Sequence, residues 1–243
     1  MSFDGLSLSS HTIPAPAPIE PTEKRRRWFE LCLIVFLAFS GSVLRAMETF
    51  RNGPLAVTEY GAMRWLNVTF HKVGILLLLG YVLWRGGRSF HDIGFRWSIK
   101  DAVLGIPLYA VFRALYFCSA FSIGHVHYAF FGVYPPHNTA LQVFGHMPLV
   151  ALLDILINPF YEELVVRAYL MTEIRSLSGS MALAAAISLI LQTSYHLYYG
   201  WWIGISIGLS FVAFAAYFAK SRRALPIVVA HAIADIVGFV RLQ

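Results

Sequence analysis

The stretch NPFYEELVVRAYL, residues 158–170, places Glu162, Glu163 and Arg167 inside a segment that is otherwise mostly apolar. A charged side chain at the centre of a membrane helix costs roughly 2.5–3.5 kcal/mol on insertion scales before it finds a partner. Charges grouped in this way are expected either to pair with other residues of the protein or to line a polar cavity and serve a function there.

The chain as a whole is strongly apolar. Of its 243 residues, 58% are hydrophobic and only 13% are charged, whereas soluble domains carry about 25% charged residues. This composition predicts a polytopic membrane protein. The net charge of +6 requires no nucleic acid partner, because Lys and Arg gather beside membrane helices. Cys32 and Cys118 lie far apart in apolar runs and predict neither a disulfide framework nor a metal site.

Seven apolar segments are each close to the ~20 residues that a helix needs to cross a bilayer. We expect an all-α membrane protein with about seven transmembrane helices, which surround an intramembrane catalytic cavity. Residues 1–27 are expected to form a disordered cytoplasmic tail and residues 28–243 the transmembrane domain. The seven segments lie at about 28–46, 64–84, 101–124, 146–172, 180–199, 201–219 and 224–241.

Pro159 lies within the fourth of these segments and predicts a kink or break near the two glutamates. The tail, rich in proline, is not expected to be a signal peptide, because its basic cluster at residues 24–27 leads into a full-length span.

The distribution of Lys and Arg predicts a cytoplasmic N-terminus. In that orientation the cytoplasmic side holds 12 of the 19 basic residues, and the outer loop at residues 124–145 holds none. The short loops and the absence of a recognisable signal peptide favour an integral protein of a bacterial inner (plasma) membrane.

Polar residues on three of the expected helices form the candidate site. Glu163 and Arg167 are four residues apart, so they share a helical face and can pair. Glu162 points about 100° away from Glu163, and is therefore expected to face a cavity as a general base. His231 and Asp235 also share a face. The full candidate set is Glu162, Glu163, Arg167, His196, His231 and Asp235.

These residue types suit the hydrolysis of a peptide bond. A buried Glu can take a proton from water near neutral pH, and a His can hold the same water. A second His with a carboxyl neighbour can stabilise the oxyanion. Two Glu and two His could alternatively bind zinc. No HExxH motif is present, however, so we expect no cofactor and keep zinc as the less favoured alternative.

Three further features carry structural predictions. Arg113 and Asp154 are expected to pair, because an unpaired buried charge is costly. Gly200, Gly204 and Gly208 recur every four residues and predict close approach of a neighbouring helix. The aromatic stretch HVHYAFFGVYPPHN is expected to lie as a loop on the membrane surface.

Three of these site motifs resemble those of a known family. EELVVR begins at Glu162 and fits the EExxxR motif of the CPBP intramembrane proteases, also called the ABI or CAAX-protease family. HAIAD begins at His231 and fits the family's HxxxN/D motif, and His196 lies where its FxxxH motif belongs. The resemblance covers about residues 149–238, and the helices before it carry no signature.

The resemblance implies an all-α membrane endopeptidase without a cofactor, of the glutamate type rather than the metal-dependent type described earlier for the family. Its partners would be the lipid bilayer and a substrate that is a membrane-anchored or lipid-modified protein or a small peptide. By this likeness Glu162 and His196 would activate water, His231 and Asp235 would stabilise the oxyanion, and Glu163 and Arg167 would support them.

The sequence departs from the family pattern at two positions. Gln192 replaces the aromatic residue of FxxxH, and could either pack or donate a hydrogen bond into the cavity. Asp235 stands where many members have Asn. Because an Asp must be protonated to donate to an oxyanion, we predict that activity depends on pH.

The sequence alone leaves two other functions open. One is a non-catalytic membrane scaffold or immunity-type factor, and the other is a Glu/His proton-coupled transporter. No inverted repeat supports the transporter, and the intact Glu162, His196 and His231 argue against lost chemistry. Counting along the helices places Glu162 and His231 toward the cytoplasmic half of the membrane and His196 toward the outer end, so the sequence alone does not bring His196 to the site.

Overall fold

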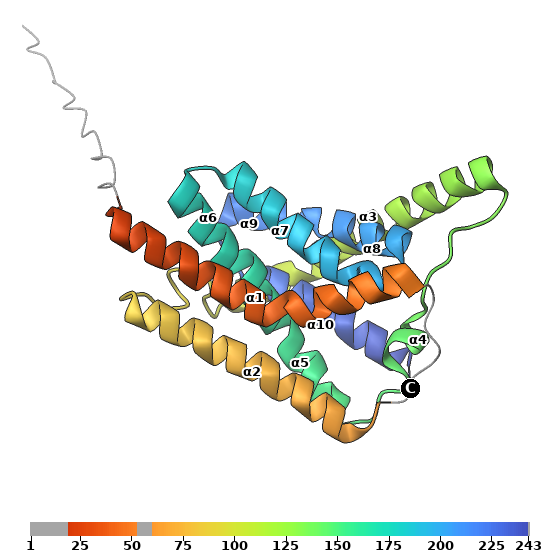
Figure 1. The fold of residues 1–243 in the computed structure, drawn as a ribbon, viewed down its shortest axis with the longest axis horizontal. Helices are drawn as coiled ribbons and strands as arrows, with labels where there is room; N and C mark the ends of the chain where they lie inside the picture. Colours follow the sequence, from red (N-terminus) through yellow and green to blue (C-terminus); the bar gives the residue numbers. More distant parts are fainter. Residues whose placement is uncertain (1–18, 53–59, 243) are drawn as a thin grey trace, which may run out of the picture.

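The computed structural model describes residues 19–52 and 60–242, and within those ranges the chain is helical, with no strand (Figure 1). The all-α class is therefore confirmed. Of the predicted tail, residues 1–18 lie outside the described residues, and residues 21–27 are the first turns of helix α1. The elements are α1 (Pro21–Asn52), α2 (Ala62–Arg85), α3 (Ile99–Phe131), α4 (Ala140–Phe144), α5 (Ala151–Glu162), η1 (Glu163–Tyr169), α6 (Leu170–Ser178), α7 (Met181–His196), η2 (Leu197–Tyr199), α8 (Trp201–Ser210), α9 (Val212–Ser221) and α10 (Leu225–Val240).

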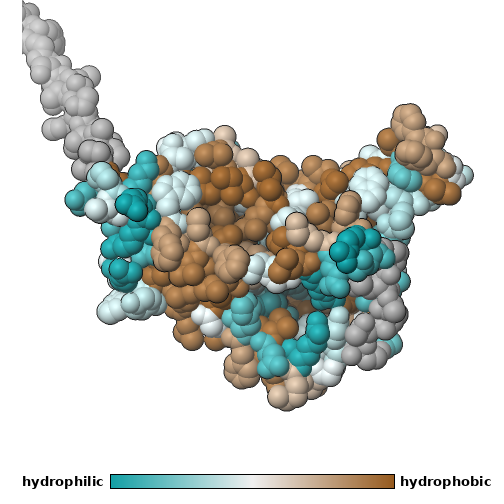
Figure 2. Space-filling model, viewed as in Figure 1, coloured by the Kyte–Doolittle hydropathy of each residue, from teal (hydrophilic) through white to brown (hydrophobic). Residues whose placement is uncertain are grey.

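The helices have the lengths and hydropathy of membrane spans. In the described part of the chain, five are long and apolar enough to cross a bilayer: α1, α2, α3, Met181–Tyr199 and Trp201–Ser221. The shorter apolar α10 and the continuous α5–η1–α6 helix complete the seven segments expected from the sequence. The surface shows an apolar middle, with hydrophilic residues gathered at the end where α1 begins and at the opposite end (Figure 2). The chain is an integral membrane protein.

The fourth segment is one continuous helix with a widened turn. It continues through Pro159 in α5 and changes at Glu163 to the π-helix η1, in which the Leu170 N–H bonds to the Val165 carbonyl five residues earlier. The kink or break expected near the glutamates is thus a local widening and not an interruption. All seven residues of η1 are buried. Such π-turns are rare in proteins, and those that occur are often found at functional sites.

Two glycines of the predicted strip, Gly204 and Gly208, lie close to the C-terminal end of α7, whereas Gly200 lies against Pro136 and His137. A Cβ added at Gly204 would lie 2.9 Å from the Leu197 Cα, and one added at Gly208 would lie 2.1 Å from the Thr193 Oγ1. Neither distance leaves room for a side chain. The close contact holds the C-terminal end of α7, which carries His196, against α8.

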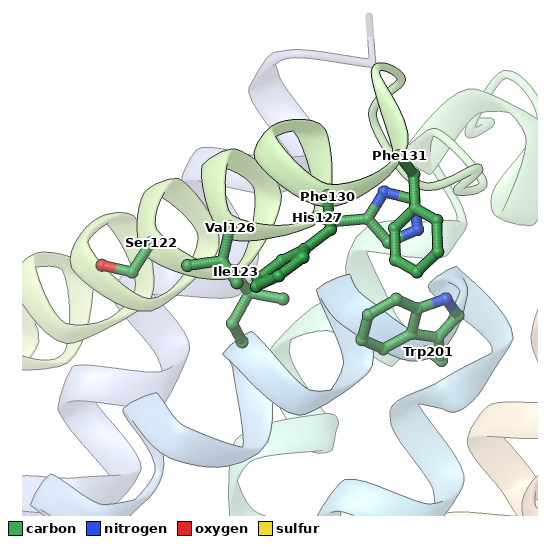
Figure 3. Close-up of a pocket in the computed structure, with 7 residues that line it drawn as sticks. All are labelled: Ser122, Ile123, Val126, His127, Phe130, Phe131 and Trp201. Carbon is green, nitrogen blue, oxygen red and sulfur yellow. The ribbon is translucent and has the colours of Figure 1, made fainter.

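The prediction of an outer loop at residues 124–145 is wrong for residues 124–131, because α3 continues to Phe131. The helix continues through Gly124 and ends at Gly132, whose φ of +71° places it in the left-handed conformation. In Figure 1 this end of α3 projects from the bundle. Phe130 and Phe131 are exposed there, and with Trp201 of α8 they line a shallow apolar pocket of about 330 Å³ (Figure 3). The first half of the aromatic stretch that was predicted as a loop is therefore helical, and the second half is not.

Candidate active site

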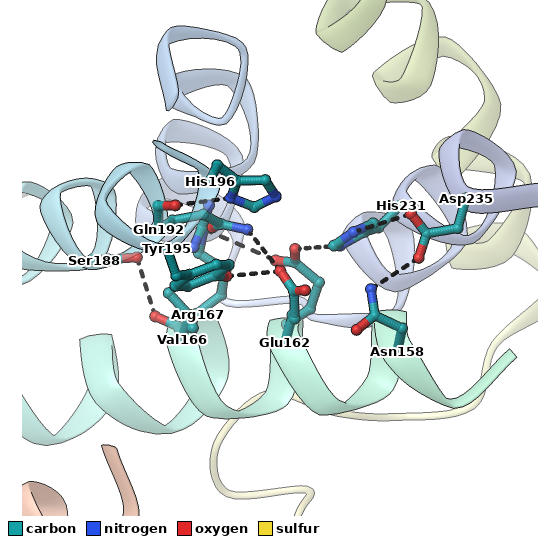
Figure 4. A network of polar contacts seen from close by, with 11 residues as sticks. Asn158, Glu162, Val166, Arg167, Ser188, Gln192, Tyr195, His196, His231 and Asp235 are labelled. Atoms are coloured by element: carbon teal, nitrogen blue, oxygen red, sulfur yellow. Dashed lines mark hydrogen bonds and ion pairs between the residues drawn. The ribbon is translucent and has the colours of Figure 1, made fainter. Parts of the chain in front are cut away.

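A cavity of about 1010 Å³ lies between the helices and contains the centre of the predicted site. Its walls come from α1, α2, α3, α5, α7, η2, α8 and α10, from Phe211 after α8, and from the segment between α3 and α5. Four of the six predicted residues line it: Glu162, His196, His231 and Asp235. The other two, Glu163 and Arg167, are fully buried behind this wall. Figure 4 shows side chains from α5, α7 and α10 converging.

Glu162 is held by one of its carboxylate oxygens. Its Oε2 accepts a 2.6 Å hydrogen bond from the Tyr195 hydroxyl and a 3.2 Å bond from the Gln192 Nε2 (Figure 4). No described residue donates to its Oε1. Gln192, the departure from the family's aromatic residue, therefore donates a hydrogen bond at the site. The arrangement fixes the carboxylate and leaves one oxygen able to accept a proton.

Glu163 lies beside Arg167, as predicted, although the contact is long. The Arg167 Nε is 3.8 Å from the Glu163 Oε2, and both side chains are completely buried. The other oxygen, Oε1, lies 2.8 Å from the His231 Nδ1. The Arg167 guanidinium also lies 5.2 Å from the centre of the Phe211 ring. Glu163 thus connects the π-helix to α10.

His231 belongs to a chain of polar contacts that ends on α5. Its Nε2 is 3.5 Å from the Asp235 Oδ1, and the Asn158 Nδ2 donates to the Asp235 Oδ2 at 2.9 Å (Figure 4). Glu163, His231, Asp235 and Asn158 therefore follow one another across the α5–α10 interface. The contacts start on η1, pass through two residues of α10 and end on α5, so both nitrogens of the imidazole have a carboxylate neighbour.

His196 is the last residue of α7, and it is buried and lines the same cavity as Glu162 and His231. The His196 Nδ1 donates to the Gln192 carbonyl at 2.8 Å, which leaves Nε2 as the free acceptor. The Phe211 ring lies 5.5 Å from the imidazoles of both His196 and His231. The tertiary structure therefore brings His196 to the cavity that Glu162 and His231 line, which counting along the helices did not predict.

The expected pair between Arg113 and Asp154 does not form. The Lys72 Nζ lies 2.8 Å from the Asp154 Oδ2, because α2 packs beside α5 (Figure 1). Arg113 instead lies over the rings of Tyr116 and Phe117, 5.2 and 4.5 Å from their centres. The charge on Asp154 is therefore balanced from α2, and Arg113 remains on the wall of the cavity.

Sequence reasoning missed Tyr195 and Asn158. Both carry a signal that was available, because Asn158 precedes Glu162 by one helical turn and Tyr195 directly precedes His196. The structure also shows why Tyr195 is rigid. Its ring stacks on Phe39 of α1, with ring centres 4.7 Å apart and planes inclined by 6°. Helices outside the motif region thus position a residue that holds Glu162.

The side chains present do not make a metal ligand set. Among the described residues, no three His, Cys, Asp or Glu side chains come together as one. Both nitrogens of His231 face carboxylates, and the His196 Nδ1 is occupied by a backbone carbonyl. No step of the proposed chemistry therefore runs through a metal ion.

Comparison with known proteins finds a family model that matches the segment containing this site. Residues 144–237 match the family described as Rce1-like, type II CAAX prenyl endopeptidase Rce1-like. No curated protein and no solved structure matches the chain. The matched segment begins in α4 and ends within α10, so it includes every predicted site residue. This match confirms the resemblance read from the motifs, and residues 144–237 are similar to the Rce1-like family of CAAX endopeptidases.

Proposed function

We propose that this protein is an intramembrane endopeptidase in which Glu162 activates the attacking water. The family match supports a CAAX-type intramembrane protease. The observation that supports the glutamate mechanism is the state of the Glu162 carboxylate. Its Oε2 is bound by Tyr195 and Gln192, while no described residue donates to its Oε1 on the cavity side.

The first step is attack by water. A water molecule between Glu162 and His196 donates one hydrogen to the Glu162 Oε1 and the other to the free His196 Nε2. Glu162 takes the proton as the water oxygen bonds to the carbonyl carbon of the substrate. The carbonyl π-electrons move to oxygen and form a tetrahedral oxyanion.

The oxyanion is stabilised from the α10 side. His231 donates its Nδ1–H to Glu163 and directs its Nε2 toward Asp235 and the cavity. A proton on Nε2, or on Asp235, is then available to the developing negative charge. Donors that are already oriented where charge develops contribute about 100- to 1000-fold to the rate in other hydrolases.

The second step breaks the peptide bond. The oxyanion collapses to a carbonyl, the C–N bond breaks, and Glu162 gives its proton to the leaving amine. The products are a carboxylic acid and an amine, and the glutamate returns to its ionised form. Tyr195 and Gln192 hold the same oxygen of Glu162 throughout, so Oε1 both receives and returns the proton.

The substrates in this proposal are membrane-anchored or lipid-modified proteins or small peptides. The cavity lies among membrane helices, and an extended segment in the bilayer is the natural source of a peptide bond at that depth. We further propose a cytoplasmic N-terminus and a bacterial inner membrane. Most Lys and Arg residues flank the end of the bundle where α1 begins, which the positive-inside rule assigns to the cytoplasm.

Comparison of membranes that carry wild-type protein or Glu162→Gln tests the mechanism. New protein termini would be profiled by mass spectrometry, with and without a chelator. Glu48→Gln is the matched control, because Glu48 is exposed on α1 and lies outside the cavity. We expect termini that vanish with Glu162→Gln, persist with Glu48→Gln and survive chelation.

Other outcomes would reject parts of the proposal. Identical termini in wild type and Glu162→Gln would favour a scaffold, and loss of ion flux without any cleaved product would favour a transporter. Loss of termini on chelation would restore a metal mechanism.

A further inference from the structure

Arg113 is a charged residue in the cavity that the proposed chemistry does not use. It lies on α3, well inside the membrane-spanning part of that helix, and lines the same cavity as Glu162. Its recorded contacts are with the faces of two aromatic rings, Tyr116 and Phe117. Among the described residues, no carboxylate lies within 4.0 Å of its guanidinium. Ring faces leave the N–H donors of an arginine free.

The packing of α3 on α10 places Arg113 at the level of the active site. The Arg223 Nη1 just before α10 lies 2.8 Å from the Asp101 Oδ1 at the start of α3, and a Cβ on Gly105 would lie 2.6 Å from the Val229 Cγ1. The two helices therefore run in the same direction in register. Because residues rise equally along both, Arg113 is level with the part of α10 near Asp235.

The cavity is also lined by Lys72, Arg45 and Arg64. Arg64 lies over the Tyr60 ring and is exposed near the start of α2, far along that helix from Lys72. Lys72 pairs with Asp154. Arg45 donates to the Tyr60 hydroxyl and to the Val143 carbonyl, both at 2.8 Å. An unpaired arginine inside a membrane helix is costly, and such residues characteristically mark substrate pathways. Arg113 therefore has both the free donors and the position to meet an incoming anion.

We propose that Arg113 binds a carboxylate of the substrate and thereby sets which peptides the cavity accepts. The carboxylate belongs either to a free C-terminus or to an Asp or Glu side chain near the scissile bond. A guanidinium presents paired N–H donors that match both oxygens of a carboxylate. This inference rests on the proposed peptidase function, because it assigns the anion to the peptide that Glu162 cleaves.

Binding to a variant that cannot cleave tests the inference. Purified Glu162→Gln protein in lipid nanodiscs would be titrated with short peptides that carry an N-terminal palmitoyl chain. One pair differs only in a free C-terminal carboxylate or an amide. A second pair ends in an amide and differs only in an internal Asp or Asn. The first pair reports a terminal carboxylate, and the second reports a side-chain carboxylate.

In the Glu162→Gln background we expect the carboxylate member of one pair to bind at least about tenfold more tightly than its neutral partner. Addition of Arg113→Gln should remove that preference, and Arg113→Lys should keep part of it. Addition of Arg175→Gln is the control, because Arg175 is exposed on α6, outside the cavity, and removes the same charge. It should leave the preference unchanged. Melting temperatures of all variants establish that they fold.

Two results would overturn the inference: equal binding within both pairs, or a carboxylate preference that persists in folded Arg113→Gln protein. Its failure is separable from failure of the peptidase proposal. If wild type cleaves no peptide while the carboxylate preference still depends on Arg113, the chemistry is wrong and the anion subsite stands. If wild type cleaves both members of each pair with equal KM, the subsite is wrong and the peptidase stands.

Discussion

Glu163 and Glu173 are two completely buried carboxylates on one continuous helix, and their surroundings differ. Glu173 is paired at both oxygens, with the Arg27 Nε at 2.8 Å and the Arg88 Nη1 at 2.5 Å. Glu163 has one hydrogen bond, with His231 at 2.8 Å, and its second oxygen has only Arg167 at 3.8 Å. The first carboxylate is fully satisfied, and the second is not.

The difference separates a structural role from a functional one. Glu173 joins α1, the connection after α2, and α6 at the end of the bundle where α1 begins. Buried polar groups are normally hydrogen-bonded, and incomplete satisfaction in a native site is found where catalysis or strain requires it. Glu163 lies directly behind the cavity wall and positions His231. We therefore expect substitution of Glu173 to lower mainly the stability, and substitution of Glu163 to lower mainly the catalytic rate.

The largest effect expected is on stability, from Glu173→Gln. The substitution leaves Arg27 and Arg88 without their anion, and loss of one partner from a buried ion pair costs about 3–5 kcal/mol. The melting temperature of the purified protein should fall strongly, while the activity of each folded molecule should remain close to wild type. Glu23→Gln is the control, because its pair with Arg26 is partly exposed and worth at most about 1 kcal/mol. An unchanged melting temperature for Glu173→Gln would contradict a structural role for Glu173.

Glu163→Gln should have the converse effect. It keeps the volume of the side chain and removes the negative charge that faces His231. The neutral amide binds the imidazole N–H more weakly than a carboxylate does, so the imidazole is held less firmly. A displacement of about 1 Å at a reacting group can cost about 100-fold in rate. We expect a fall in kcat of that order, with a smaller loss of melting temperature than Glu173→Gln causes. A kcat close to wild type would show that His231 does not depend on Glu163.

Tyr195→Phe should reduce activity by about tenfold, because it removes the 2.6 Å hydrogen bond that orients the Glu162 carboxylate. Tyr161→Phe is the matched control. Tyr161 also lines the cavity, but its hydroxyl donates to the Ala38 carbonyl and not to the site. Steady-state kinetics on both variants would test this, and equal losses would indicate a general packing effect.

The smallest effect expected is in the pH profile of Asp235→Asn. An Asp donates to an oxyanion only when it is protonated, whereas an Asn amide donates at any pH. As pH rises, wild type should lose this donor and the variant should keep it, so the ratio of variant to wild-type rate should increase severalfold toward alkaline pH. Rate profiles across neutral and alkaline pH measure the ratio. A flat ratio would mean that Asp235 is not the donor.

Much of the fold and of the candidate set could be predicted because each rests on local sequence. The seven apolar segments follow from the length and hydropathy that a bilayer requires. The pairing of Glu163 with Arg167 follows from helical spacing, and the family match at residues 144–237 confirms the resemblance that was read from the motifs. The roles of the individual site residues remain predictions.

What the sequence determined by itself is therefore an all-helical membrane protein with acidic and imidazole groups in its spans, since helical period and hydropathy act within one segment. Only the tertiary structure decided how those groups meet. It placed the end of α7 inside the protein, gave Gln192 a bond to Glu162, and paired Asp154 with Lys72 in place of Arg113. These contacts depend on where helices end and which neighbours they meet, and that is set by packing between segments far apart in the chain.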